Sequence, residues 1–163
     1  MADTQNPLWQ YALQVYARDQ VKEACLCLQD ETGVDVILLL AAAYLGHCGR
    51  RLSEVELQQL TVAGAVPRES CVAVLRQLRR KVAEEAGSAG QQRCYNALKE
   101  AELAAEHWQV ELIMVEIAGW GVSPADTVAD RATIISANMA LFVPRCHSSR
   151  ARAALGQFER AVV

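Results

Sequence analysis

Apolar residues recur along this chain with the period of α-helices. Between residues 21 and 28, apolar side chains return at spacings of three and four residues, which predicts a helix with one buried face. The pattern changes from Val36 to Leu45, where ten consecutive residues are apolar. A helix that is apolar all round is either buried in a core or spans a membrane. Because a span needs about 18 apolar residues, we expect a buried central helix at about residues 35–47.

Residues that favour helix ends flank this central helix. Gly33 is expected to end the preceding helix, since glycine readily adopts the left-handed conformation of a C-terminal cap. Asp35 is expected to accept the free N–H groups at the start of the central helix. Ser53, with Glu56 three residues later, has the pattern of a capping box. The next helix is therefore expected to start after Ser53.

Similar signals predict the other helices. Asn6 followed by Pro7 predicts a helix near the N-terminus, and Pro67 is expected to open another. The Gly-Ser-Ala-Gly stretch at residues 87–90 predicts a tight turn. Further helices are expected at about residues 91–118, 130–142 and 149–162, with a restart of the chain at residues 123–124. We predict an all-α fold, a single compact bundle of about seven or eight helices around the central apolar helix, with residues 1–163 forming one domain.

Composition and charge agree with a globular protein. Of 163 residues, 52% are hydrophobic, which excludes intrinsic disorder because a disordered chain lacks apolar surface to bury. The net charge is −3; residues 1–120 carry 16 acidic and 11 basic residues, and residues 121–163 carry 3 and 5. This basic excess is too small for a nucleic-acid surface. We therefore expect neither nucleic acid nor a membrane as a partner.

The six cysteines favour a reducing compartment. The opening residues, MADTQNPLWQ, lack the basic and apolar regions of a secretory signal. Cys25 and Cys27 are separated by one residue, which is not the CxxC spacing of zinc or redox sites. We expect free, structural thiols in a cytoplasmic protein.

Several segments in this order resemble a known family. They are Pro7-Leu-Trp, Tyr16-Ala-Arg18, Cys25-Leu-Cys-Leu-Gln-Asp-Glu-Thr-Gly-Val-Asp-Val36, Leu75-Arg-Gln-Leu-Arg-Arg80 and Ala101-Glu-Leu-Ala-Ala-Glu106. Over roughly residues 7–120 the chain resembles a proteobacterial family of small helical proteins, called domain of unknown function 2390. The resemblance implies a bacterial cytoplasmic protein. It assigns no catalytic residues or ligands, so it leaves the function open.

The best-organised polar feature is a pair of charged stripes on two successive helices. Three arginines at spacings of three and four share one helical face, and glutamates share a face of the next helix. Folding the two helices back at residues 87–90 brings these stripes to the same height, where the arginines can reach Glu100 and Glu102. Three interpretations remain: a salt-bridge network that fixes helix register, an anion or phosphate site, and a docking patch for a partner. The candidate residues are Arg76, Arg79, Arg80, Glu100, Glu102 and Glu106.

Other polar groups are weaker candidates. Gln29, Asp30 and Glu31 lie beside the turn at Gly33, where turn and capping residues are expected. His107 and Glu111 are four residues apart, but no Glu-x-x-His pair of a di-iron site occurs. Gly-x-Ser-x-Gly, P-loop and Gly-x-Gly-x-x-Gly patterns are also absent from the sequence. We expect no catalytic residues, no metal ligands and no cofactor.

Two functions remain open. The absence of catalytic patterns favours a non-catalytic, cytoplasmic protein-interaction or regulatory domain with an unidentified protein partner. The alternative is a small-ligand or anion-binding domain, with or without enzymatic activity, that uses the arginine-rich face or a pocket beside the central helix. The last helix is amphipathic and basic, so an exposed apolar face there would favour a homodimer.

Overall fold

The computed structural model describes residues 6–85, 87–120 and 128–163, and every regular element in these ranges is helical. This confirms the predicted all-α fold. In chain order the elements are α1 (Pro7–Tyr16), α2 (Val21–Thr32), α3 (Val36–His47), α4 (Glu54–Ala63), α5 (Ala65–Pro67), the π-helical η1 (Arg68–Val72), α6 (Ala73–Ala83), α7 (Ala89–Ala118), α8 (Val128–Ala140), the short η2 (Val143–Arg145) and α9 (Ser149–Val162).

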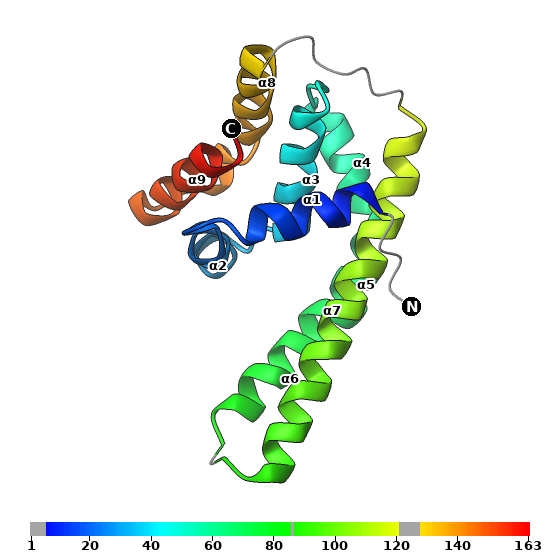
Figure 1. Ribbon diagram of the computed structural model, residues 1–163, viewed down its shortest axis with the longest axis vertical. Coiled ribbons are helices and arrows are strands. Elements are labelled where there is room, and N and C mark those ends of the chain that lie inside the picture. Colours follow the sequence, from blue (N-terminus) through cyan, green and yellow to red (C-terminus); the bar gives the residue numbers. More distant parts are fainter. Residues whose placement is uncertain (1–5, 86, 121–127) are drawn as a thin grey trace.

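The apolar run forms α3, the central helix of the bundle. Nine of its twelve residues are buried. Helices α1, α2, α4, α7 and α8 all contact it, and Figure 1 shows it between α1, α4 and α8. The prediction of a buried central helix at about residues 35–47 is confirmed, because this helix has neighbours on every side.

The predicted caps are in place. Asn6 Oδ1 accepts a backbone N–H at 3.1 Å at the start of α1, and Asp35 Oδ1 accepts one at 2.9 Å at the start of α3. Gly33 ends α2 with a φ of 68°. Ser53 and Glu56 form both hydrogen bonds of a capping box. Short-range sequence signals therefore set these helix boundaries.

A buried asparagine joins α8 to α3 and to the loop that follows it. Asn138 is fully buried, and its Oδ1 accepts the Leu52 N–H at 2.8 Å. Its Nδ2 donates to the carbonyl oxygens of Ala42 and Arg50, both at 3.0 Å. Asn138 thereby satisfies three backbone groups in the interior.

The restart predicted at residues 123–124 lies outside the described residues.

The last helix, α9, spans the predicted residues and packs against α2. Its apolar face is buried, so it offers no exposed apolar surface for a homodimer. The buried residues of this face are Ala151, Ala154, Leu155, Phe158 and Val162.

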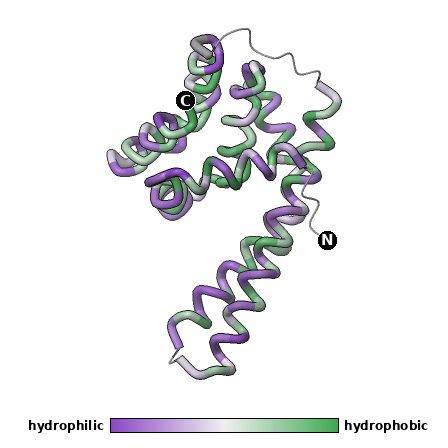
Figure 2. Tube along the Cα trace, viewed as in Figure 1, coloured by the Kyte–Doolittle hydropathy of each residue, from purple (hydrophilic) through white to green (hydrophobic). Residues whose placement is uncertain are grey.

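Helix α6 and the first half of α7 form a hairpin that extends away from the other helices (Figure 1). Hydrophilic and hydrophobic residues alternate along it (Figure 2), and Val74, Leu78 and Leu103 of the hairpin are partly exposed. The prediction that Pro67 opens a helix is wrong. Pro67 is the last residue of α5, and the helical backbone continues through η1 into α6. A proline is tolerated there because the first turn of a helix does not need its missing N–H. None of the described helices is long and apolar enough to cross a lipid bilayer.

Candidate functional site

The arginine and glutamate stripes meet between α6 and α7. Arg76 Nε donates to Glu102 Oε1 at 2.7 Å, and Arg76 Nη2 donates to Glu106 Oε1 at 2.7 Å. Arg76 Nη1 donates to Gln29 Oε1 of α2 at 2.6 Å. Each nitrogen of Arg76 therefore has an acceptor, and the acceptors come from two different helices.

Glu102 lies between two arginines. Arg79 Nε donates to Glu102 Oε2 at 2.5 Å, and only 8% of the Glu102 side chain is exposed. Burial raises the pKa of Glu102, but hydrogen bonds from Arg79 and Arg76 outweigh this effect and hold the pKa below its ordinary value of 4.5. Glu102 is therefore ionised at neutral pH.

Glu106 completes the cluster from the next turn of α7. Burial raises its pKa, and the charge of Arg76 opposes that rise. Two guanidinium groups thus face two carboxylates, which leaves no excess positive charge to attract an external anion. We call these four residues, Arg76, Arg79, Glu102 and Glu106, the hairpin cluster.

The two other predicted residues lie outside the hairpin cluster. Arg80 pairs with Asp30 of α2 at 2.8 Å, and both side chains are about half exposed. The expected contact with Glu100 is wrong, since Glu100 is exposed and contacts no cation among the described residues. The reason is helical geometry: Glu100 is two residues from Glu102, so its side chain points about 200° away around the helix.

A second polar contact lies at the start of α3. Gln109 of α7 is 1% exposed, and its Nε2 donates to Asp35 Oδ2 at 2.5 Å. Arg68 Nε lies 3.6 Å from the same oxygen. Asp35 is therefore more than a helix cap, because it also joins α3 to α7 and η1. This role of Asp35 was not predicted from the sequence, nor were the contact of Gln109 and the pairing of Gln29 and Asp30, expected only as turn or capping residues, with the arginines of α6.

His107 occupies the position that was considered for a metal. Its Nδ1 lies 3.2 Å from Glu111 Oε1, and its ring meets the Trp9 ring edge-on at a centroid distance of 4.9 Å. Its Nε2 is buried without a hydrogen-bond partner in the described structure. Among all the residues that the structure describes, no group of three or more histidine, cysteine or acidic side chains is placed to hold a metal ion.

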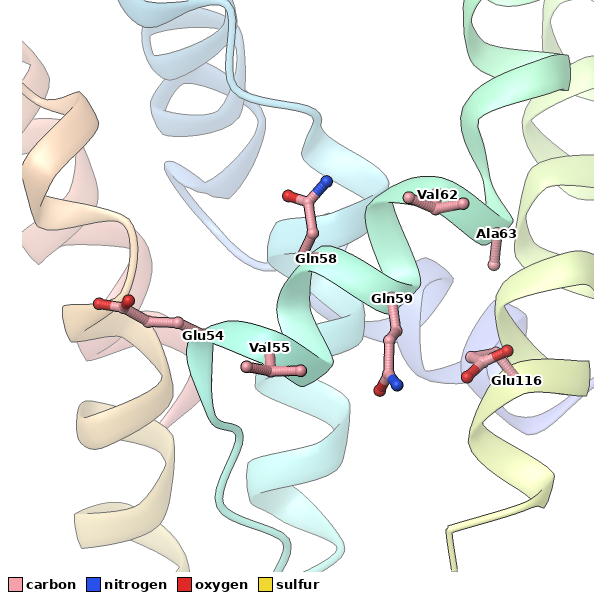
Figure 3. A pocket seen from close by; sticks show the side chains of 7 residues that line it. All are labelled: Glu54, Val55, Gln58, Gln59, Val62, Ala63 and Glu116. Carbon is pink, nitrogen blue, oxygen red and sulfur yellow. The ribbon is translucent and has the colours of Figure 1, made fainter.

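A groove between α4 and α7 was not predicted from the sequence. Its volume is about 520 Å³. Val55, Val62 and Ala63 supply apolar surface, and Glu116 reaches from α7 toward α4 (Figure 3). The other residues that line this α4–α7 groove are Glu54, Gln58 and Gln59.

Comparison with known families places the chain. Residues 7–113 match the family described as protein of unknown function (DUF2390). The chain belongs to the DUF2390 family. No curated protein and no solved structure matches it.

The DUF2390 match divides the features described above. It contains the hairpin cluster, the Asp35–Gln109 contact and the whole of α4. The last residues of α7, with Glu116, and all of α8 and α9 follow the matched segment. The matched segment thus contains α3 and most of the helices that pack on it. Outside the segment, α8 packs against α3 and α9 packs against α2.

Proposed function

We propose that this protein is a non-catalytic protein-interaction domain of the bacterial cytoplasm and that the α4–α7 groove is its docking surface. The supporting observation is exposed apolar surface at the groove: Val55 is 69% exposed and Val62 is 65% exposed. Two more exposed valines, Val66 and Val115, lie within three residues of groove residues along the chain. Exposed apolar surface gathered at one place marks interaction sites.

The groove fits a basic amphipathic helix from another protein. Glu54 and Glu116 line it, no lysine or arginine does, and neither carboxylate has a partner in the described structure. A helix that presents small apolar side chains to the valines and lysine or arginine to the two glutamates would match both properties. Burial of the valines supplies affinity, and the charges supply orientation.

A second copy of this chain is a poorer occupant. The chain itself offers two basic amphipathic helices, α6 and α9. The apolar face of α9 is already buried on α2, and the three arginines of α6 already pair with carboxylates of the same chain. Binding either helix in the groove of another copy would require these contacts to break. We therefore propose a different protein as the partner.

The alternative, an anion site on the arginine-rich face, has less support. Every nitrogen of Arg76 donates to a protein acceptor, and the hairpin cluster carries equal numbers of arginines and glutamates. These contacts favour the interpretation that the hairpin cluster fixes the register of α6 and α7.

The cytoplasmic location rests on the thiols. All six cysteines are free, and Cys25 and Cys146 are buried as small apolar side chains. Free thiols in such number suit a reducing compartment. The bacterial source rests on the family resemblance described above.

Site-specific photo-crosslinking tests the groove. A photoreactive amino acid is placed at Val62 in cells that naturally produce the protein, with the matched control at Leu26, which is 41% exposed on α2. We expect an adduct with a different protein from position 62 only. The crosslinked segment should be a basic amphipathic helix, and the double variant E54K/E116K should abolish the adduct.

Three results would contradict the proposal. They are no adduct beyond that of the Leu26 control, an adduct between two copies of this chain, and an adduct that survives the charge reversal at Glu54 and Glu116. The last result would show that charge does not select the occupant.

A further inference from the structure

A second cavity lies where the end of α2 meets the start of α3. Its volume is about 350 Å³, at the lower end of the roughly 300–1,000 Å³ typical of small-molecule sites. Its walls come from segments that are far apart in the sequence, namely residues 32–35, Leu38, Thr61, Arg68 and Arg145. It shares no residue with the α4–α7 groove.

Arg145 of η2 lines this cavity with its hydrogen-bonding groups free. Its guanidinium carbon lies 5.6 Å from the centre of the Phe142 ring. Within the described part of the chain, the Arg145 side chain has no hydrogen-bond acceptor and no carboxylate partner. Its N–H groups are therefore available to an acceptor that enters the cavity.

The charges that line the cavity are unbalanced. Arg68 has one weak ion pair, at 3.6 Å from Asp35 Oδ2. The same oxygen already accepts the Gln109 amide at 2.5 Å. The lining thus contains two arginines and one carboxylate, which leaves an excess positive charge. The hairpin cluster shows the opposite arrangement, in which arginines and glutamates balance.

We propose that this cavity binds a small molecule through a carboxylate or phosphate group held between Arg68 and Arg145. Both anionic groups present oxygens that match the N–H edge of a guanidinium. Leu38 and Val34 supply apolar wall for the rest of the molecule.

Two threonines that line the cavity, Thr32 and Thr61, add a preference among anions. The hydroxyl of Thr32 donates to the Leu28 carbonyl at 2.6 Å, and that of Thr61 donates to the Leu57 carbonyl at 2.8 Å. Since both hydrogens are used, these oxygens can only accept further hydrogen bonds, and Thr32 Oγ1 already accepts one from the Val34 N–H at 3.1 Å. They favour an anion that also carries a hydroxyl or amine group.

Titration of the full chain, followed by the amide NMR signals of Gly33, Val34 and Thr61, tests this site. The probes are acetate, inorganic phosphate and the neutral acetamide, at constant ionic strength. We expect saturable shifts with acetate or phosphate and none with acetamide. The more effective anion identifies the group as carboxylate or phosphate.

Variants assign the binding to the two arginines. Arg145→Gln and Arg68→Gln should each weaken anion binding at least about tenfold, the effect of losing a charged hydrogen bond. Arg93→Gln is the control, since it makes the same charge change at an exposed side chain of α7 that lies outside the cavity. It should leave the dissociation constant within about twofold because solvent screens distant charges.

The proposal is overturned if neither anion gives saturable shifts. It is also overturned if Arg145→Gln leaves binding unchanged, or if Arg93→Gln weakens it as much. Arg145 is exposed, so its variant decides the question even if Arg68→Gln fails to fold. None of these results bears on the α4–α7 groove.

Discussion

Replacing Glu102 by glutamine removes the carboxylate that two arginines share. Its oxygens accept from Arg76 Nε at 2.7 Å and from Arg79 Nε at 2.5 Å. Removing one partner of a fully buried ion pair costs about 3–5 kcal/mol. The two arginine side chains are 23% and 24% exposed, so water restores part of their solvation. We therefore expect the free energy of unfolding to fall by about 2 kcal/mol.

Urea unfolding followed by circular dichroism measures this loss. Glu100→Gln is the matched control, because Glu100 lies on the same helix, is exposed and is outside the hairpin cluster. Its effect should stay within about 0.5 kcal/mol. A chain of this size should lose about 4–8 °C in Tm for a 2 kcal/mol change. If Glu102→Gln costs no more than Glu100→Gln, the reasoning is refuted, since desolvation would then cancel the attraction between Glu102 and the arginines.

Three further predictions concern pH, packing and thiol reactivity. Because the folded pKa of Glu102 lies below 4.5, its stabilisation is present above that pH and is lost as the pH falls through the lowered pKa. The urea midpoint of the wild type should therefore drop more steeply below pH 4.5 than that of Glu102→Gln, and parallel curves would contradict this. Gly46→Ala would place a Cβ 2.8 Å from the Ile135 Cα, so α3 and α8 must separate; we expect a loss of about 1–3 kcal/mol by urea unfolding, and an unchanged midpoint would contradict it. A thiol-reactive dye should modify exposed Cys94 before Cys25, because burial raises the pKa of Cys25 to about 12; labelled peptides that show Cys25 modified as early as Cys94 would disprove this order.

The elements that the sequence predicted depend on neighbours along the chain. The caps at Asn6, Asp35 and Ser53 involve residues two or three positions apart, so local chemistry determines them. The contact between Arg76 and Glu102 was also predictable, because two helices joined by a tight turn must run antiparallel. The predicted contact with Glu100 was wrong for a related reason. It rested on the position of Glu100 along the helix axis and left out the direction of its side chain around that axis.

The missed contacts depend on tertiary packing. Gln29 meets Arg76 only because α2 comes within side-chain reach of α6, and no local pattern states which helices lie near one another. Two others did carry a signal. Gln109 lies among buried Ala105 and Ile113 on one face of α7, and Asn138 lies beside buried Met139. A polar amide within an apolar stripe indicates a buried hydrogen bond, although its partner requires the fold.

The distribution of charge explains why binding is proposed away from the arginine-rich face. A charged side chain attracts a ligand of opposite charge only where no group of the protein already neutralises it. In the hairpin cluster, carboxylates of the protein already do so for Arg76 and Arg79. The α4–α7 groove keeps unpaired negative charge beside exposed valines, and the cavity at the start of α3 keeps an unpaired Arg145. The number of arginines on a helix is therefore a poor guide to an anion site in this protein. The number of arginines that no carboxylate neutralises is the better guide.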